Sequence, residues 1–234
     1  MEKIFLKKKY LEKIKYLNKC NEYYYIKSNP LISDNEYDKI KNEILLIEKH
    51  NPNFVIKNSP SRIVGFKPSK NFKKVKHKVP MLSLGNAFNE EDLKNFEKKI
   101  INFLSLKEVK QIEYSAEPKI DGISASLIYI DGKFTKGLSR GDGNEGEDIT
   151  ENLKTIKDIP SEINKNNFPE EIDIRGEVFI ENDDFKKIND KFANPRNAAS
   201  GSLRQKNSLI TSKIPLKFIA YTYGYEKKMN INNQ

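Results

Sequence analysis

The spacing of apolar residues changes part-way along the chain, and this change constrains the fold more than any other feature. In the first half, apolar side chains recur at helical intervals, as they do at Ile4, Leu11, Ile14 and Leu17. From about residue 112 onward, apolar and polar residues alternate, which is typical of half-buried strands. The chain is therefore expected to have an α+β fold, with a small helical N-terminal domain before a domain built on a mainly antiparallel sheet.

The helical half of the sequence predicts three helices, which cover about residues 2–19, Asn35–His50 and Asn89–Leu104. The second and third carry their apolar sides on Tyr37, Ile40, Ile44 and Ile47 and on Leu93, Phe96 and Ile100, and Ser33 or Asp34 can cap the second. Residues 51–80 are rich in Pro, Ser, Asn and Lys, so they are expected to form a linker or an extended connection.

The alternating half predicts a hairpin and two further strands. Ser124–Ile130 and Lys133–Ser139 are expected to pair across a tight Asp131-Gly132 turn. Residues 172–180 alternate in the same way, and so do residues 216–223. Because side chains alternate between the two faces of a strand, Arg175 and Glu177 should lie on the face opposite the apolar residues.

The composition indicates a polar, basic protein. The net charge is +9, which suits a phosphate-rich partner such as nucleic acid, but a general preference for Lys in the source genome would produce the same excess. One cysteine, Cys20, and two histidines exclude an internal disulfide and a zinc finger. No apolar run is long enough to span a bilayer and no signal peptide is recognisable, so a cytoplasmic protein without a membrane partner is expected.

The arginines are more informative than the net charge, because the planar guanidinium has uses that lysine cannot replace. All five lie in turn-rich or Gly-rich contexts, at Arg62, Arg140, Arg175, Arg196 and Arg204. Arg196 and Arg204 are candidates for contacts with DNA phosphates outside a nucleotide pocket. Helix capping and internal hydrogen bonding are equally good interpretations of the two residues.

The sequence Glu117-Pro118-Lys119-Ile120-Asp121-Gly122 contains a Lys-x-Asp-Gly element, which nucleotidyltransferases use to present a nucleophilic amine. Such a lysine attacks an α-phosphate and forms a phosphoramidate. The four residues alone are weak evidence, since a strand end followed by a turn would look the same. Glu177 could bind ribose hydroxyls or a metal ion, or it could form a surface ion pair with Arg175 or a lysine.

Two other segments have ordinary interpretations. Gly141-Asp142-Gly143-Asn144-Glu145-Gly146 matches G-x-G-x-x-G, but it follows a hairpin strand and its carboxylates would repel a pyrophosphate. A flexible acidic turn is expected there instead of a dinucleotide fold. Tyr23-Tyr24-Tyr25 with Asp34 to Asp38 could form an aromatic and acidic surface, but core tyrosines and favourable charge at a helix N-terminus explain them better.

Taken together, these segments resemble the NAD-dependent DNA ligases of bacteria, from about Tyr10 to about Tyr225. The matching pieces come in the order typical of the family: Tyr24-Tyr25 and Ile32–Asp38, Ser59–Gly65, His77–Leu84, Glu117–Gly122, Ser139–Gly143 and Gly146–Thr150, Arg175–Val178, and Phe192–Gln205.

The resemblance implies a domain that captures the nicotinamide mononucleotide (NMN) half of NAD over residues 1–68. It also implies an adenylation, or nucleotidyltransferase, domain over residues 69–234. In such a protein Lys119 would receive AMP from NAD, in the presence of Mg²⁺, as the first step of sealing nicked duplex DNA. The resemblance assigns NMN to Tyr24, Tyr25, Asp34, Asn35, Glu36, Tyr37 and Asp38, and the adenosine half to Ser83, Leu84, Glu117, Arg140 and Glu177; it implies no metal-ligating residue.

The chain departs from the family at its C-terminus. The family's later Asp-Gly-Val-Val-x-Lys strand and a further lysine have no counterpart here, so the sheet domain is expected to be C-terminally truncated. Both lysines help to neutralise phosphates during nucleotidyl transfer. The alternatives are therefore a non-catalytic nucleotide- or DNA-binding remnant, or half of a split ligase that needs a second polypeptide.

Overall fold

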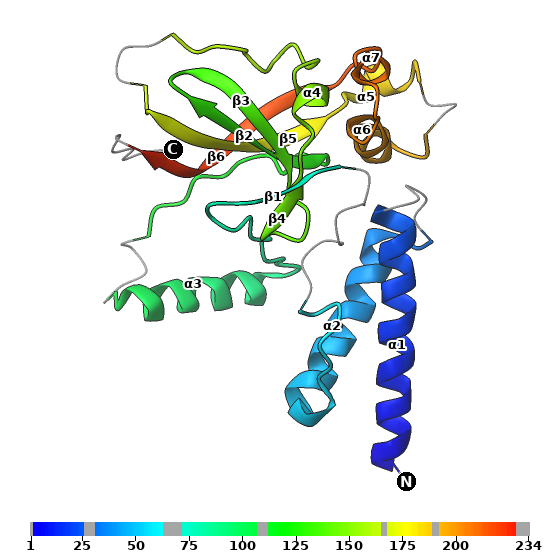
Figure 1. The fold of residues 1–234 in the computed structure, drawn as a ribbon. Helices are drawn as coiled ribbons and strands as arrows, with labels where there is room; N and C mark the ends of the chain where they lie inside the picture. Colours follow the sequence, from blue (N-terminus) through cyan, green and yellow to red (C-terminus); the bar gives the residue numbers. More distant parts are fainter. Residues whose placement is uncertain are drawn as a thin grey trace. The chain divides into compact units, whose positions relative to one another are not determined.

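The computed structural model describes residues 2–25, 31–62, 72–106, 112–164, 168–188 and 192–227 (Figure 1). Contacts divide the chain into two compact units. The larger unit contains residues 1–81 together with 121–234, and the smaller unit is the segment Leu82–Ile120 between them. The sequence interpretation of a helical N-terminal region followed by an antiparallel-sheet domain is confirmed.

Two long helices, α1 (Glu2–Tyr25) and α2 (Asp34–His50), pack against each other at the N-terminus. Ser33 caps α2 through a capping box with Glu36, in which each side chain binds the other residue's backbone N–H. The core between the helices is formed by Tyr10, Ile14, Leu17, Ile44 and Phe54, against which Leu6, Ile32, Tyr37, Ile40, Ile47 and Ile56 pack.

The apolar face predicted for α1 is only partly right. Ile14 and Leu17 are buried, but Ile4 is 77% exposed and Leu11 is 41% exposed. The buried stripe instead runs through Tyr10, whose ring points towards α2 while its hydroxyl finds a polar partner. Ile4 and Leu11 lie at the edge of this stripe, because the helical repeat turns them about 100° or more away from Tyr10.

Within the expected linker, residues 51–62 are tied to the N-terminal helices. The 3₁₀ helix η1 (Pro52–Phe54) follows α2 directly, and Phe54 is buried. Ser59 and Ser61 donate hydrogen bonds to the Glu48 carboxylate, which also accepts one from the Tyr10 hydroxyl. The sequence predicted a linker or an extended connection and gave no sign of these contacts, because the polar side chains that make them carry no apolar periodicity.

The second half forms a four-stranded antiparallel sheet in the order β3-β2-β5-β6. Its strands are β2 (Ile123–Ile130), β3 (Lys133–Ser139), β5 (Glu171–Phe179) and β6 (Lys217–Lys227). The predicted Asp131-Gly132 hairpin is confirmed, with φ of 48° and 76° at the two turn residues, as a type I′ turn requires. A smaller two-stranded sheet pairs β1 (Lys74–Lys76) with β4 (Glu145–Glu147).

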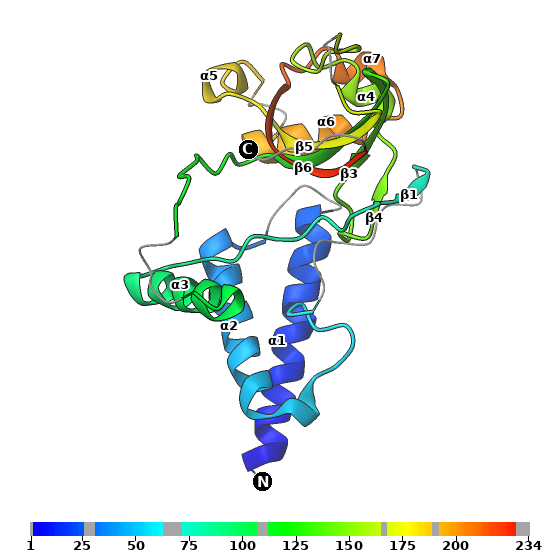
Figure 2. The same ribbon diagram turned by 90° about the vertical axis from the view of Figure 1, so that its left-hand side faces the viewer.

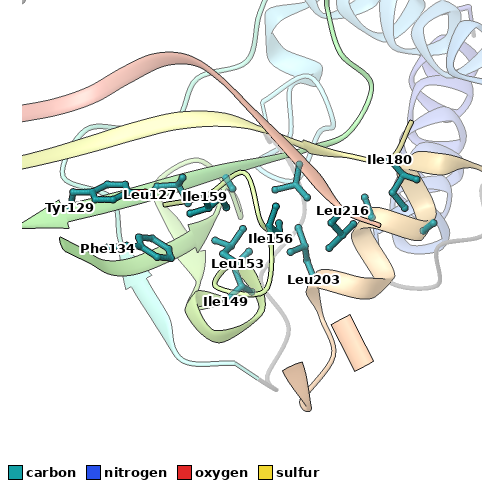
Figure 3. Close-up of a cluster of buried hydrophobic side chains, with 14 of the residues drawn as sticks. Leu127, Tyr129, Phe134, Ile149, Leu153, Ile156, Ile159, Ile180, Leu203 and Leu216 are labelled. Atoms are coloured by element: carbon teal, nitrogen blue, oxygen red, sulfur yellow. The ribbon is translucent and has the colours of Figure 1, made fainter. Parts of the chain in front are cut away.

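One face of the large sheet carries the main hydrophobic core (Figure 3). This cluster joins strand residues such as Leu127 and Tyr129 to Leu153 of α4 (Thr150–Leu153) and Leu203 of α6 (Pro195–Leu203). Figure 2 shows the sheet curving around these helices. Two further short helices lie in the connection between β5 and β6: α5 (Asn182–Phe185) precedes α6, and α7 (Ser208–Thr211) follows it.

The opposite face of β5 is polar, as the alternation predicted. Asp173, Arg175 and Glu177 point away from the apolar residues, opposite Ile128, Ser126 and Ser124 of β2. Arg175 and Asp173 are nevertheless buried.

The smaller unit is built on α3 (Glu90–Leu104), whose N-terminus is capped by Asn89. Leu93 and Phe96, on its predicted apolar side, are about half exposed, at 50% and 51%. Residues 112–120 then run without regular secondary structure towards β2. Among the described residues, no helix is both long and apolar enough to cross a bilayer.

Candidate functional site

A pocket opens where strands β2 and β3 meet helix α6, and three arginines line it. Arg140 follows β3, Arg196 lies in the first turn of α6, and Arg204 ends that helix. The remaining lining residues are Ile123, Ser124, Ser139, Gly141, Glu147, Ile149, Ser200 and Leu203. Three guanidinium groups around one pocket make it suited to an anion with several oxygens, such as a phosphate.

The backbone of the Arg140 turn is held by glycines at positive φ. Gly141 and Gly143 have φ of 58° and 93°, and a Cβ on Gly141 would lie 1.9 Å from the carbonyl oxygen of Glu145. The turn leads directly into β4, where Gly146 and Glu147 are buried. The expected acidic turn is therefore present, and it is a packed part of the pocket wall.

Arg196 and Arg204, which were expected outside the nucleotide pocket, line the same pocket as Arg140, one of the residues expected at the adenosine half. Arg196 donates a 2.7 Å hydrogen bond to Asp121 and lies over the Tyr24 ring, 5.3 Å from its centroid. Sequence spacing could not show this, because the short helix α6 brings its two ends to one pocket.

A second cluster of polar groups lies beside the arginines on the sheet. The Ser124 hydroxyl donates a 2.8 Å hydrogen bond to Glu177. Tyr221 of β6 belongs to this cluster, since its pKa is raised by burial and by the Glu177 charge and lowered by a hydrogen bond with Ser124. Glu177 therefore has a partner in a polar cluster that also borders the pocket, a position suited to binding ribose hydroxyls.

Sequence reasoning missed Ser124, Tyr221 and Glu147. Tyr221 is the extra residue at a bulge, because Arg175 pairs with Thr222 while Gly176 pairs with Ala220. Such a bulge turns a side chain out of strict alternation, and nothing in the alternating pattern predicts it. Glu147 is 1% exposed, and its burial could have been suspected only from the glycine that precedes it.

Arg175 forms its ion pair with Asp173, at 3.1 Å between Nη2 and Oδ2. Its guanidinium also donates to the carbonyl oxygens of Val79 and Pro80. Ser126 donates a further hydrogen bond to Asp173. The polar face of β5 therefore carries a buried ion pair beside Glu177.

His77 is buried next to this ion pair, and its Nε2 atom lies 3.2 Å from the Arg140 carbonyl oxygen. Burial lowers the pKa of His77, although the hydrogen bond to the Arg140 carbonyl and the Asp173 charge oppose this shift. Because its partner is a carbonyl oxygen, Nε2 is the donor to the turn that carries Arg140.

The predicted nucleophile lies in the smaller unit. Lys119 and Glu117 are both exposed there, and Ser115 Oγ lies 3.4 Å from a Glu117 carboxylate oxygen. Ser83 and Leu84 belong to the same unit and are also exposed. The larger unit brings together Arg140 and Glu177, the other two residues expected at the adenosine half.

The residues expected to hold NMN lie at the C-terminal end of α1 and in the first turns of α2. Tyr24, Tyr37 and Asp38 are half-buried, whereas Asn35 and Glu36 are exposed. The Glu36 carboxylate completes the capping box of α2, and hydrogen bonds from Ser33 lower its pKa. The side chains of Tyr25 and Asp34 lie outside the described part of the structure.

A protein-borne metal cluster is absent from the described residues, in that no three His, Cys, Asp or Glu side chains come together there. Mg²⁺ that accompanies a nucleotide is usually held by phosphate oxygens, waters and one or two carboxylates, so it does not require such a cluster.

Comparison with known proteins connects this geometry to a family. Residues 69–234 match the NAD-dependent DNA ligase adenylation domain, and residues 6–65 match the DNA ligase-like, N-terminal NAD⁺-binding domain.

Three curated relatives named DNA ligase illustrate the similarity. The protein of Pelagibacter ubique (strain HTCC1062) is 77% identical over 96% of the chain and 33% of its own length. Those of Parvibaculum lavamentivorans and Rickettsia massiliae are 50% and 49% identical, over 89% and 92% of the chain and 30% and 32% of their own lengths.

The chain spans about a third of the length of the curated relatives it matches. Within that third, the two matched domains follow each other in the order of a helical region and an antiparallel sheet, as they do in the structure. The chain therefore belongs to the NAD-dependent DNA ligase family, with the family's NAD⁺-binding domain at its N-terminus and the adenylation domain after it.

Proposed function

We propose that the chain catalyses transfer of adenylate from NAD to Lys119, the first step of sealing a nick in duplex DNA. The Lys119 amine attacks the α-phosphorus of the AMP half, the P–O bond to the other phosphate breaks, and NMN leaves with the bridging oxygen. The Lys119 ammonium loses one proton to become nucleophilic and a second as the N–P bond forms, and both pass to solvent, so the product is a neutral phosphoramidate nitrogen that keeps one hydrogen.

The pocket of three arginines is the observation that best supports the proposal. Nucleotidyl transfer places negative charge on the phosphate oxygens, and fixed guanidinium groups stabilise such charge without reorganising. Arg140, Arg196 and Arg204 supply these groups around one pocket, and Glu177 lies beside it with Ser124 as its hydrogen-bond donor.

We infer that Tyr24, Tyr25, Asp34, Asn35, Glu36, Tyr37 and Asp38 bind the NMN half, and that Ser83, Leu84, Glu117, Arg140 and Glu177 bind the adenosine half. Residues 1–68 and 69–234 are proposed as the corresponding domains. Arg196 supports a link between the two halves of the site, because it lines the phosphate pocket and also lies over the Tyr24 ring. Mg²⁺ would partly neutralise the negative charge of the diphosphate that joins the AMP and NMN halves of NAD.

Intact-mass measurement after incubation with NAD and Mg²⁺ tests the proposal directly. The wild-type chain should gain one adenylate, and Lys119→Arg should gain none. Lys98→Arg is the matched control, since Lys98 is an exposed lysine of the same unit and its replacement should leave the adduct unchanged. If no adduct forms but NMN still binds, the chain is a nucleotide-binding remnant. If adduct formation is restored when the segment that follows the matched region in the relatives is added as a second polypeptide, the chain is half of a split enzyme.

Nicked duplex DNA is proposed as the macromolecular partner in the cytoplasm. Arg196 and Arg204 remain candidates for backbone phosphate contacts, because both are partly exposed at the pocket. Replacing Arg196 by Ala should weaken binding of nicked DNA and reduce the slope of affinity against salt by about one phosphate contact. An unchanged slope would restrict Arg196 to the nucleotide.

A further inference from the structure

Arg175 joins the sheet to a segment that lies far from it in the sequence. Its side chain is 9% exposed and donates to three acceptors: the Asp173 carboxylate, the Val79 carbonyl oxygen at 2.5 Å and the Pro80 carbonyl oxygen at 3.1 Å. The two carbonyls belong to a stretch without regular secondary structure. The buried guanidinium of Arg175 therefore holds the backbone of Val79 and Pro80 in place.

The same stretch is held from its other side by the turn that carries Arg140. The His77 amide donates to the Asn144 carbonyl oxygen and the Met81 amide donates to the Gly143 carbonyl oxygen, both at 2.8 Å. Met81 itself is buried, at 3% exposure. Amides bind the Arg140 turn and carbonyls bind Arg175, so residues 77–81 are fixed between strand β5 and the turn that lines the pocket.

The location of this anchor in the chain gives it a consequence. Met81 is the last residue of the larger unit before the chain enters Leu82–Ile120, the unit that carries Lys119, and the chain returns at Asp121. Asp121 is in turn held by Arg196 through a 2.7 Å hydrogen bond. Both ends of the Lys119-bearing unit are therefore attached to the sheet unit beside a buried or half-buried arginine.

We propose that Arg175 is a positioning residue for adenylation, because it fixes the point from which the Lys119-bearing unit leaves the sheet. This inference rests on the proposed function of Lys119. Arg175 is not expected to touch the nucleotide; it acts through Val79 and Pro80. Its role depends on the forked shape of the guanidinium and not on its charge alone.

The fold around Arg175 accommodates the guanidinium and little else. A Cβ on Gly224 would lie within 2.2–2.3 Å of three guanidinium atoms, so the group packs directly on the backbone of β6. A lysine ammonium carries the same charge but is a single compact donor, and it cannot keep the parallel contacts to Asp173 and to two successive carbonyls. Arg175→Lys therefore separates charge from geometry.

The experiment compares wild type, Arg175→Lys and Lys157→Gln. Lys157 is an exposed lysine of the same unit that lies outside residues 77–81, so its loss should have little effect. Each protein is assayed for the rate of adenylate attachment at saturating NAD, for the apparent KM for NAD, and for hydrogen exchange at the His77 and Met81 amides. Thermal unfolding is recorded for all three.

Arg175→Lys should lower the rate at saturating NAD by about tenfold or more, because a small displacement of a reacting group is costly even when the ligand binds. Exchange at the two amides should rise by about tenfold as the anchor loosens. Lys157→Gln should match wild type in both measurements. A lower melting temperature with unchanged saturated rate and unchanged amide exchange would overturn the inference and leave Arg175 a purely structural residue.

The two proposals fail in different ways. A wild-type chain that forms no adduct would contradict the proposed function, and the inference would then be decided by amide exchange alone. Unchanged exchange in Arg175→Lys would contradict the anchor whether or not adenylation occurs.

Discussion

The Nε atom of Arg204 lies 3.4 Å from Oε2 of Glu147, a carboxylate that is 1% exposed. The arginine side chain itself is 35% exposed, so the pair joins a solvent-facing cation to a buried anion. Burying a carboxylate is costly unless a cation or hydrogen-bond donors compensate for the lost hydration. Arg204 thus stabilises Glu147 in addition to any role in binding phosphate.

Replacing Arg204 by Met should destabilise the fold, because it withdraws a cation from the buried Glu147. We expect a loss of about 2 kcal/mol in the free energy of unfolding, which is less than for a fully buried pair since Arg204 is partly exposed. Urea denaturation of Arg204→Met, Glu147→Gln and the double variant measures the coupling between the two residues. Strictly additive effects would show that the pair contributes nothing to stability.

The Glu48 carboxylate predicts a pH dependence of stability in the helical region. Burial opposes its charged form, but hydrogen bonds from Ser61, Ser59 and Tyr10 outweigh burial and lower the pKa of Glu48. A carboxyl whose pKa is lowered in the folded state stabilises the fold above its unfolded pKa of about 4.3. That stability is lost as the pH falls through the folded pKa.

Melting temperatures of wild type and Glu48→Gln between pH 7 and pH 3 check this prediction. The variant should be less stable by about 1–2 kcal/mol at pH 7, since the amide keeps only part of the hydrogen bonding. The difference between the two proteins should shrink below about pH 4, once the wild-type carboxyl is protonated. A constant difference over the whole range would mean that the charge of Glu48 does not contribute.

Gly224 should tolerate no side chain. The methyl group of an alanine at this position would meet the Arg175 guanidinium at 2.2 Å and force it off the strand. We expect Gly224→Ala to cost about 1–3 kcal/mol, as overpacking of a filled site usually does. Gly85→Ala is the control, because a Cβ at Gly85 meets nothing within 4 Å. Equal melting temperatures for the two variants would contradict the packing of Arg175 on β6.

The elements that depend on nearby residues were predictable from the sequence. The Asp131-Gly132 hairpin and the Ser33 cap are each determined within a few residues, and the structure has both. Contacts between distant segments were not predictable. The carbonyls that Arg175 binds lie 95 and 96 residues away, and carbonyl groups leave no mark in a sequence pattern.

The same reason explains the errors within the candidate site. Arg196 and Arg204 could be recognised as special, since arginine is rare in this chain, but their shared pocket depends on how α6 packs. Tyr221 enters the polar cluster only because β6 has a bulge there. Candidate functional residues such as Arg196 and Arg204 could therefore be identified from the sequence. Which of them lie together in the structure depends on helix packing and strand register.

Asn152 connects the end of α6 to the core and so supports Arg204. Its side-chain amide donates to the carbonyl oxygens of Leu203 and Gln205 at 2.7 and 2.9 Å, and its carbonyl oxygen accepts from Thr211. Replacement by Ala would leave these buried groups without their partner, which should cost about 2–3 kcal/mol. Asn42→Ala, on the exposed side of α2, is the control and should change stability little.

Loss of Asn152 should also reach the pocket, because the two carbonyls that it binds flank Arg204 on either side. Asn152→Ala is therefore expected to weaken binding of inorganic phosphate or NAD as well as stability, while Asn42→Ala changes neither. Isothermal titration well below the melting temperature of each variant separates the two effects. If Asn152→Ala binds as tightly as wild type under those conditions, Arg204 is held in place by Glu147 and the α6 helix without help from Asn152.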